Sequence, residues 1–162
     1  EGFGPNGVAI IIESLTDNKN RSASEIRSTF SKFNRNLGIT GCVRHNFDKV
    51  GIINYPINID DYNNFFEYCA SLDVEDINEN DDVLEVITKL ETFHDVLLNL
   101  EKKYLPPKFS SIEWRPSNII DIENEDQAKQ LLVLLDKLED LDDVQSVTSN
   151  FNIDENLMDR LI

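Results

Sequence analysis

Several features that mark particular classes of protein are scarce in this sequence. Its 162 residues include only two cysteines, Cys42 and Cys69, too few for the disulfide framework of a small secreted domain. No apolar run approaches the roughly 20 residues that a membrane-spanning helix needs, and no signal peptide stands at the start. We therefore expect a protein of a reducing, soluble compartment with no membrane partner. The first residue is Glu1 rather than Met, so we expect a piece of a longer protein.

Residues that carry catalysis or hold metals are also scarce. No serine or cysteine lies in a nucleophile motif, and the two histidines have no evident relay partner. Cys42 and His45 are three residues apart on a predicted strand, which puts them on opposite faces, and no second pair follows. The segment starting at Asp76 does not match an EF-hand calcium-binding loop, because Asp81 stands at the position of the required glycine and Ile87 stands at the position of the final glutamate. We predict no enzyme, no metal and no cofactor.

The negative charge is unevenly distributed along the chain. Residues 1–50 hold 7 Lys and Arg against 5 Asp and Glu, whereas residues 51–162 hold 8 against 26. A strongly acidic surface repels phosphate backbones, because affinity for nucleic acid rests largely on cations that neutralise phosphates. Any nucleic-acid contact made by this chain should therefore fall within the first 50 residues.

The first 50 residues predict a strand, a helix and a second strand. The continuous apolar run of residues 8–12 is typical of a strand covered on both faces. After a polar loop at 16–21, Ser22 and Glu25 form a capping box that predicts the start of a helix. That helix has one apolar stripe and is followed by a strand at 42–47. The stripe consists of Ala23, Ile26, Phe30 and Phe33.

Residues 49–119 predict the order strand–helix–strand–strand–helix–strand. The expected strands are 50–55, a weak edge strand near 74–77, 83–88 and 109–114. Between them lie a helix with apolar positions from Tyr62 to Leu72 and a second helix that Thr92 caps. This is the ferredoxin-like split βαβ order. The fold class is therefore α+β.

The last part of the chain predicts a helix and a strand. After the largely apolar residues 119–122, Asn124 with Gln127 forms a capping box before the longest apolar stripe of the chain. That stripe contains Ala128, Leu131, Leu132, Leu135 and Leu138. A strand at 144–151 and a loosely packed tail follow. Residues 1–48 supply strands and only one helix, which is too little to form a core of their own. We therefore predict one domain from 1–48 plus 120–162, with 49–119 inserted as a second α+β domain.

Two loops in the first 50 residues are candidates for anion binding. The glycine-rich start precedes a strand, whereas phosphate loops follow one, so we interpret it as structural turns. The loop at 16–21 lies before a helix N-terminus and has donors for phosphate or carboxylate. Its alternative interpretation, local Asx-turn bonds with the other side chains solvated, is equally favoured. The predicted turn residues are Gly2, Gly4, Pro5, Gly7, Gly38 and Gly41.

Taken together, EGFGPNGVAIIIESLTDNKNR, the helix with Arg27, Phe30 and Lys32, and NLGITGCV resemble the YebC/PmpR family. Trp114-Arg115-Pro116 and LLVLLDKLEDLDDVQSV resemble its C-terminal block. The family includes a mitochondrial translational activator of cytochrome c oxidase subunit I. The resemblance implies three domains: a basic helical N-terminal domain, absent here, and an α+β domain carrying a ferredoxin-like insertion. The family usually has a glycine pair where this chain has Asn34-Arg35, so we expect a different turn there, and Arg35 adds a cation.

The resemblance also implies a non-enzymatic regulator of gene expression. Its partner would be DNA, as for a transcriptional regulator, or the ribosome and its rRNA, with help from the missing domain. The expected location is the cytoplasm of a bacterium, or the mitochondrial matrix or another organelle of a eukaryote, and the expected state is a monomer. The alternative is a protein–protein adaptor whose acidic faces bind basic ribosomal or regulatory proteins. The expected nucleic-acid or ribosome contacts are Thr16, Asn18, Lys19, Asn20, Arg21, Arg27, Lys32, Arg35 and Arg44.

Overall fold

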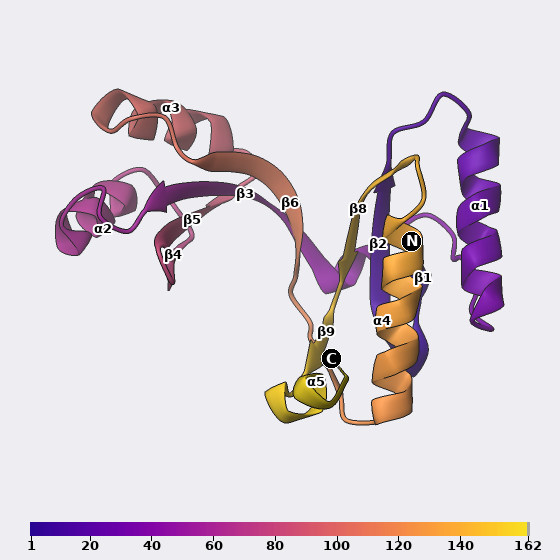
Figure 1. The fold of residues 1–162 in the computed structure, drawn as a ribbon. Helices are drawn as coiled ribbons and strands as arrows, with labels where there is room; N and C mark the ends of the chain where they lie inside the picture. Colours follow the sequence, from indigo (N-terminus) through magenta and orange to yellow (C-terminus); the bar gives the residue numbers. More distant parts are fainter. Residues whose placement is uncertain (162) are drawn as a thin grey trace. The chain divides into compact units, whose positions relative to one another are not determined.

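A computed structural model describes residues 1–161 of the chain (Figure 1). These residues form two compact units. The first comprises Glu1–Asp48 and the chain from Arg115 onward, and the second comprises Lys49–Trp114. The chain is α+β, with helices and strands in both units, which confirms the predicted fold class.

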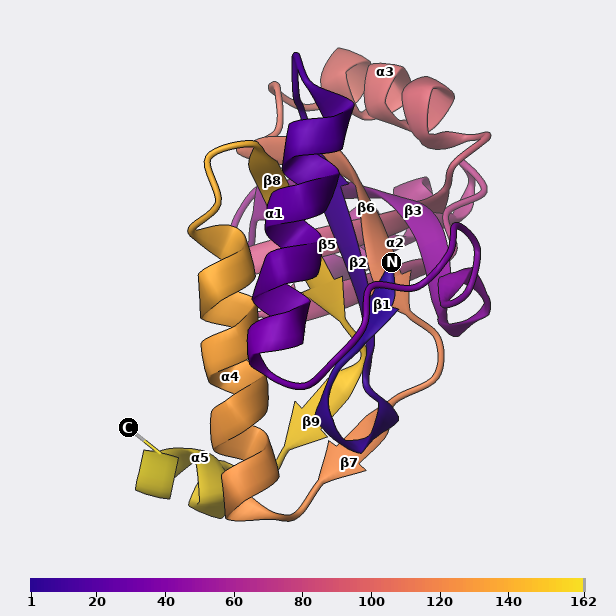
Figure 2. The same cartoon turned by 90° about the vertical axis from the view of Figure 1, so that its right-hand side faces the viewer.

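The first unit contains two small sheets and three α-helices. Strands β1, β2 and β8 form an antiparallel sheet in that order, and β7 pairs in parallel with β9. Figure 2 shows α1 and α4 side by side in front of the three-stranded sheet. The elements are β1 (Gly2–Phe3), the 3-10 helix η1 (Pro5–Gly7), β2 (Ala9–Ser14), α1 (Lys19–Lys32), the 3-10 helix η2 (Arg44–Asn46), β7 (Ile120–Ile122), α4 (Glu125–Glu139), β8 (Val144–Ser149), β9 (Phe151–Ile153) and α5 (Glu155–Leu161).

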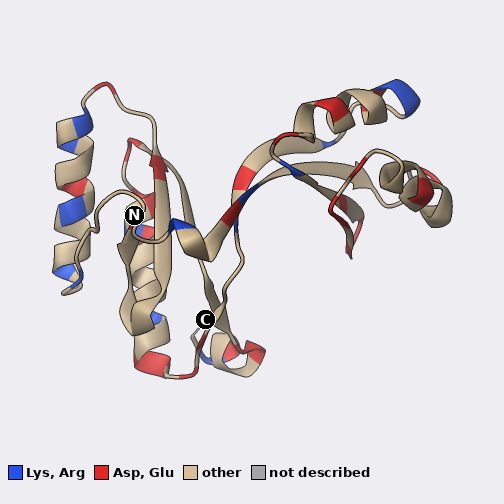
Figure 3. Ribbon diagram, turned by 180° about the vertical axis from the view of Figure 1, so that it is seen from behind, with Lys and Arg blue, Asp and Glu red and all other residues tan. Residues whose placement is uncertain are grey.

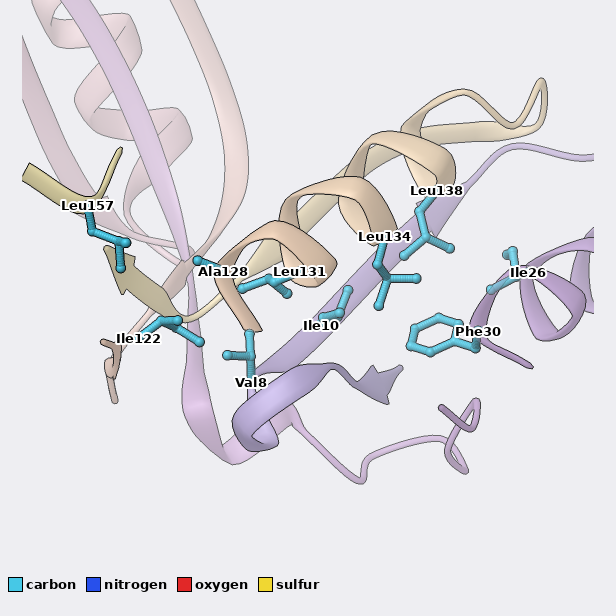
Figure 4. Close-up of a cluster of buried hydrophobic side chains, with 10 residues drawn as sticks. All are labelled: Val8, Ile10, Ile26, Phe30, Ile122, Ala128, Leu131, Leu134, Leu138 and Leu157. Atoms are coloured by element: carbon cyan, nitrogen blue, oxygen red, sulfur yellow. The ribbon is translucent and has the colours of Figure 1, made fainter. Parts of the chain in front are cut away.

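One apolar core joins the elements of the first unit (Figure 4). Ile10 of β2 and Phe30 of α1 are fully buried, together with three leucines of α4. Side chains of a strand alternate between faces and those of a helix recur every three to four residues, so each element turns one apolar side inward. The core consists of Val8, Ile10, Ile26, Phe30, Ile122, Ala128, Leu131, Leu134, Leu138 and Leu157.

Asn150 connects the two sheets of this unit where the chain passes from β8 to β9. It is fully buried. Its Oδ1 accepts a hydrogen bond from the Ala9 amide at 2.8 Å, and its Nδ2 donates to the Asn118 carbonyl at 2.7 Å. The Asn118 side chain in turn donates to Asn46 Oδ1 at 3.2 Å. Buried polar groups are stable only when bonded in this way, so three asparagines tie segments distant in sequence together.

The second unit is a four-stranded sheet with order β4-β5-β3-β6 and two helices. Ile53 and Tyr55 alternate on one face of β3 and pack with buried residues of both helices, such as Phe65 and Leu100. Both helices therefore cover the same face of the sheet. The elements are β3 (Phe47–Pro56), α2 (Tyr62–Ala70), β4 (Asp76–Asn80), β5 (Val83–Lys89), α3 (Phe93–Lys103) and β6 (Phe109–Pro116).

The element order of the second unit is the predicted strand–helix–strand–strand–helix–strand order. The structure places the second boundary between the units at Trp114/Arg115, before the 119/120 that the sequence predicts. The reason is that the Ser117 amide donates to the Asn46 carbonyl at 2.9 Å, and Asn118 bonds to both Asn46 and Asn150. These bonds attach the segment after β6 to the first unit.

Three predictions about local structure are wrong. The strand predicted at 42–47 is absent up to residue 46: 44–46 form η2, and the Asn46 amide donates to the Val43 carbonyl at 3.0 Å, so that β3 begins only at Phe47. The strand predicted at 144–151 is two strands, because Asn150 interrupts it and β9 pairs with β7 instead of β2. The tail is not loose, since α5 buries Leu157 in the core of the first unit.

Caps predicted from short motifs have mixed outcomes. Asn124 caps α4 as predicted, accepting a hydrogen bond from the Gln127 amide at 3.0 Å. Thr92 precedes α3 but its hydroxyl caps no amide, and its backbone is already in the helical region. The hydroxyl points back to the Lys89 carbonyl at 3.5 Å instead.

Candidate functional site

Helix α1 begins earlier than the sequence predicts, and Asn18 caps it. The Asn18 Oδ1 accepts a hydrogen bond from the Arg21 amide at 3.1 Å, and Thr16 Oγ1 accepts one from the Asn18 amide at 3.0 Å. Ser22 is buried within the first turns of the helix, and its amide donates to the Asn18 carbonyl at 3.1 Å. The predicted capping box of Ser22 and Glu25 is therefore wrong: the polar loop itself supplies the cap.

Asp143, in the loop between α4 and β8, joins the loop before α1 to the far end of the chain. Its Oδ2 lies 2.6 Å from Ser22 Oγ and accepts hydrogen bonds at 3.0 Å from Thr16 Oγ1 and from Arg21 Nη2. Arg21 also pairs with Asp17 at 2.9 Å. The bond from Ser22, followed by those from Arg21 and Thr16, holds the pKa of Asp143 below its usual value. Thr16 and Arg21 thus bond within the protein.

The other predicted contacts on α1 carry exposed charge. Lys19, Asn20, Arg27 and Lys32 are exposed and lie outside the buried side of the helix. Within residues 1–161 the three cations of this group form no ion pair. Figure 3 shows the Lys and Arg segments along this helix, at the left of the view, where Glu25 is the helix's one acidic residue. The helix therefore presents uncompensated positive charge to solvent.

Arg35 and Arg44 differ from the cations of α1. Arg35 follows the helix and is partly buried, with its amide bonded to the Phe30 carbonyl at 3.0 Å. Arg44 lies in η2, and its Nε is 3.2 Å from Glu1 Oε1. Partial burial by itself raises the pKa of Glu1. Hydrogen bonds from the Gly41 and Val43 amides and the nearby charge of Arg44 together outweigh this effect, so the pKa is lower than its usual value. Arg44 is thus held against Glu1.

Of the predicted turn residues, two have a left-handed backbone and the others do not. Gly7 and Gly41 have positive φ, +74° and +89°, in the region that glycine adopts without strain. Gly2 is in strand β1 rather than a turn, and a Cβ there would be 2.8 Å from the Phe30 ring. Gly4 and Pro5 lie at the start of η1, and the Gly38 amide donates to the Glu1 carbonyl at 2.8 Å.

The turn after α1 also uses a left-handed residue. Asn34, the first residue of the pair at which the sequence predicts a different turn, takes φ 55°, and Arg35 has no positive φ. Asparagine adopts this backbone region more readily than other non-glycine residues. The turn therefore forms without the glycine pair.

Sequence reasoning missed Asp143 as a partner of the candidate loop. Asp142-Asp143 reads as a polar turn between a helix and a strand, and nothing in its local pattern indicates a contact with Thr16 or Ser22. The pairing of β2 with β8 brings the loops together, with Ser14 opposite Val144. Only the sheet register reveals that contact.

The structure also limits other kinds of site. In residues 1–161 no helix is both long and apolar enough to cross a membrane. Over the same residues, no three His, Cys, Asp or Glu side chains are grouped so that they could hold a metal ion.

Known proteins resemble this chain over almost its whole length. The sequence profile described as the second and third domain of TACO1/YebC matches residues 1–151. A probable transcriptional regulatory protein of Rickettsia typhi is 46% identical over 97% of this chain and 62% of its own length. One of Zymomonas mobilis is 42% identical over 99% of this chain and 64% of its own length. The chain thus spans less than two thirds of these relatives.

A solved structure has the same fold. The crystal structure of a conserved hypothetical protein from Aquifex aeolicus superposes with a TM-score of 0.80 at 37% identity. The match covers 95% of this chain and 63% of the Aquifex protein.

Proposed function

The chain belongs to the TACO1/YebC family, and from this membership we propose that it is a non-enzymatic regulator of gene expression that contacts nucleic acid through α1. The nucleic acid is DNA or the rRNA of a ribosome. Relatives over almost the whole chain carry the name probable transcriptional regulatory protein, which supports the regulatory role. These relatives are bacterial, which favours the cytoplasm over the mitochondrial matrix as the site of action.

The observation that carries the proposal is the exposed charge of α1. Lys19, Arg27 and Lys32 face solvent with no ion pair within residues 1–161. Cations held in this way can neutralise phosphates without first breaking an internal salt bridge, whereas Arg21 would have to leave Asp17 and Asp143. The contact set proposed from the sequence therefore narrows to the cations of α1, with Asn20 beside them.

The remaining predicted contacts take supporting roles in this proposal. Thr16, Asn18 and Arg21 build the start of α1 and fix it to Asp143. Arg35 extends the positive charge past the end of the helix. Acidic surfaces elsewhere disfavour phosphate and so restrict the orientation in which nucleic acid can approach.

The test compares a double variant that removes two cations of α1 with a control variant that removes two paired cations of α4. Arg27→Ala combined with Lys32→Ala should lower the slope of log affinity against log salt by about two for duplex DNA or an rRNA fragment, because two phosphates are no longer neutralised. The control is Lys129→Ala combined with Lys137→Ala on α4, whose cations are paired with Glu125 and Asp140. It should leave the slope unchanged.

Fluorescence anisotropy at salt concentrations from about 50 to about 200 mM provides the measurement. If the slope decreased equally in both double variants, the affinity would depend on the net charge of the chain and not on the position of the cations. An unchanged slope in the α1 variant would remove α1 as the contact. Binding of rRNA but not DNA would assign the role to translation.

A further inference from the structure

Two aromatic side chains of α2 remain exposed, although the same helix buries Phe65 and Cys69. Tyr62 is 41% exposed and Phe66 is 46% exposed. Their rings lie one helical turn apart and stack, with centroids 6.1 Å apart and 26° between the ring planes. Such a pair adds little to the stability of a helix. Exposed aromatic clusters are instead typical of surfaces that bind a partner.

The surroundings of this pair are acidic. The second unit, Lys49–Trp114, has 14 Asp and Glu against 5 Lys and no Arg. Asp60 and Asp61 immediately precede α2, and Glu67 follows Phe66. Glu67 is exposed and makes no ion pair in the part of the chain that the structure describes. The surface thus combines aromatic rings with an excess of negative charge, which Lys103 offsets in part near Asp60.

The two aspartates are held in place by the fold. Asp60 Oδ2 accepts a hydrogen bond from the Tyr104 hydroxyl at 2.9 Å, and its Oδ1 accepts one from the Asp61 amide at 2.7 Å. These two bonds, the Tyr104 bond first, keep the pKa of Asp60 below its usual value. Asp61 Oδ1 caps α2 through the Asn63 amide at 3.0 Å. Both carboxylates are therefore fixed beside the start of the helix.

Another aromatic ring of α2 already binds a cation. Lys103 Nζ lies 3.9 Å from the centroid of the Tyr68 ring. The electron-rich face of an aromatic ring attracts a cation, and nearby carboxylates strengthen the attraction. Tyr62 and Phe66 offer the same chemistry to solvent, but within residues 1–161 no Lys or Arg lies over either ring.

We propose that Tyr62 and Phe66, together with the carboxylates of Asp61 and Glu67, form a docking surface for an arginine-rich polypeptide segment. Arginine fits better than lysine, because its planar guanidinium stacks on rings and bonds carboxylates bidentately at the same time. Nucleic acid fits worse, because its bases could stack on the rings but its phosphates would meet the carboxylates. The surface belongs to the second unit, whereas α1 belongs to the first, and the proposal goes beyond the nucleic-acid contact proposed above.

The probe is a short fluorescein-labelled peptide of alternating arginine and glycine, titrated with the whole chain at about 150 mM salt, where distant charges are screened. The test variant combines Tyr62→Ala with Phe66→Ala. The control combines Leu98→Ala with Leu105→Ala, whose side chains are 41% and 73% exposed in the same unit and carry no ring. Circular dichroism melts test whether both variants fold, which we expect because the altered side chains are exposed.

We expect the aromatic variant to bind the peptide at least about fivefold more weakly than the unaltered chain, because two cation–π interactions are removed. The leucine control should stay within about twofold. The proposed α1 variant, Arg27→Ala with Lys32→Ala, should bind the peptide normally, so this proposal and the nucleic-acid proposal can fail separately.

Four results would overturn the proposal. The unaltered chain could fail to bind the peptide, or the aromatic and leucine variants could bind it equally. The aromatic variant could bind a DNA or RNA oligonucleotide more weakly instead. Sedimentation could also show a dimer of the unaltered chain that the aromatic variant abolishes, which would make a second copy the occupant.

Discussion

A single carboxylate, Asp143, connects two loops that are far apart in sequence. It accepts hydrogen bonds from Thr16 and Ser22 and forms an ion pair with Arg21. The contact is local in space but distant in the chain, so no pattern of neighbouring residues indicates it. At the residue scale, this carboxylate attaches the loop before α1 to the loop before β8.

The lowered pKa of Asp143 predicts a pH dependence of stability. A carboxylate whose pKa is lower in the folded state stabilises the fold above its unfolded pKa, near 4, and this contribution is lost as pH falls through the folded pKa. Asp143→Asn should therefore be less stable than the unaltered chain at neutral pH, and the difference should shrink below about pH 4.

Urea unfolding at several pH values measures this effect. Asp142→Asn, at a neighbouring exposed position, provides the control and should keep the pH dependence of the unaltered chain. A difference between Asp143→Asn and the unaltered chain that stays constant down to about pH 2 would contradict the assigned linkage.

At the scale of elements, long patterns were predictable from the sequence and boundaries were not. The βαββαβ order and the apolar stripe of α4 rest on many residues each. The order is present, and so is the stripe, except that Leu134 lies in the core where the sequence predicts Leu132. The start of α1 rests on one cap, where the Ser22–Glu25 motif competes with Asn18. Asn18 is the cap because Ser22 is buried against Asp143, a tertiary contact that local propensity does not include.

Tertiary contacts also explain why the strand at 144–151 was misplaced and why fewer residues remain in the candidate site than the sequence predicts. Residues 144–151 alternate like one strand, but the side chain of Asn150 bonds to Ala9 and Asn118 and divides it. The cations of α1 were predictable as exposed positions from helical period. The engagement of Arg44 with Glu1 was not, because it depends on how a glycine-containing turn folds back.

The cap of α1 gives a direct test at this scale. Asn18→Ala should lower the free energy of unfolding by about 1 kcal/mol, because the Arg21 amide loses its hydrogen-bond acceptor. Asn20→Ala, an exposed position inside the same first turn, should change it by less than about 0.5 kcal/mol.

Chemical denaturation of the two variants under identical conditions measures the difference. If Asn18→Ala and Asn20→Ala were equally stable, the side chain of Asn18 would contribute nothing as a cap.

At the scale of the whole molecule, the net charge of −16 sets how the chain responds to salt. Like charges at this density repel one another in the folded state, and added salt screens that repulsion. The melting temperature should therefore rise as sodium chloride increases from about 10 to about 150 mM, where the screening length falls to about 8 Å.

Differential scanning calorimetry measures this response. Sucrose at matched osmolality is the control, because it leaves charge repulsion unscreened. A melting temperature that falls or stays constant with salt would mean that the internal ion pairs, such as Arg21 with Asp143, outweigh the repulsion.

The core of the first unit draws its side chains from both ends of the chain, which constrains the order of events during synthesis. Val8, Ile10 and Phe30 are made early, but their partners Leu131 and Leu134 follow the whole of Lys49–Trp114. The inserted unit can close while the ribosome is still translating, whereas the early apolar segment must wait with its surface unburied. For that interval, β2 and α1 carry apolar side chains that α4 does not yet cover.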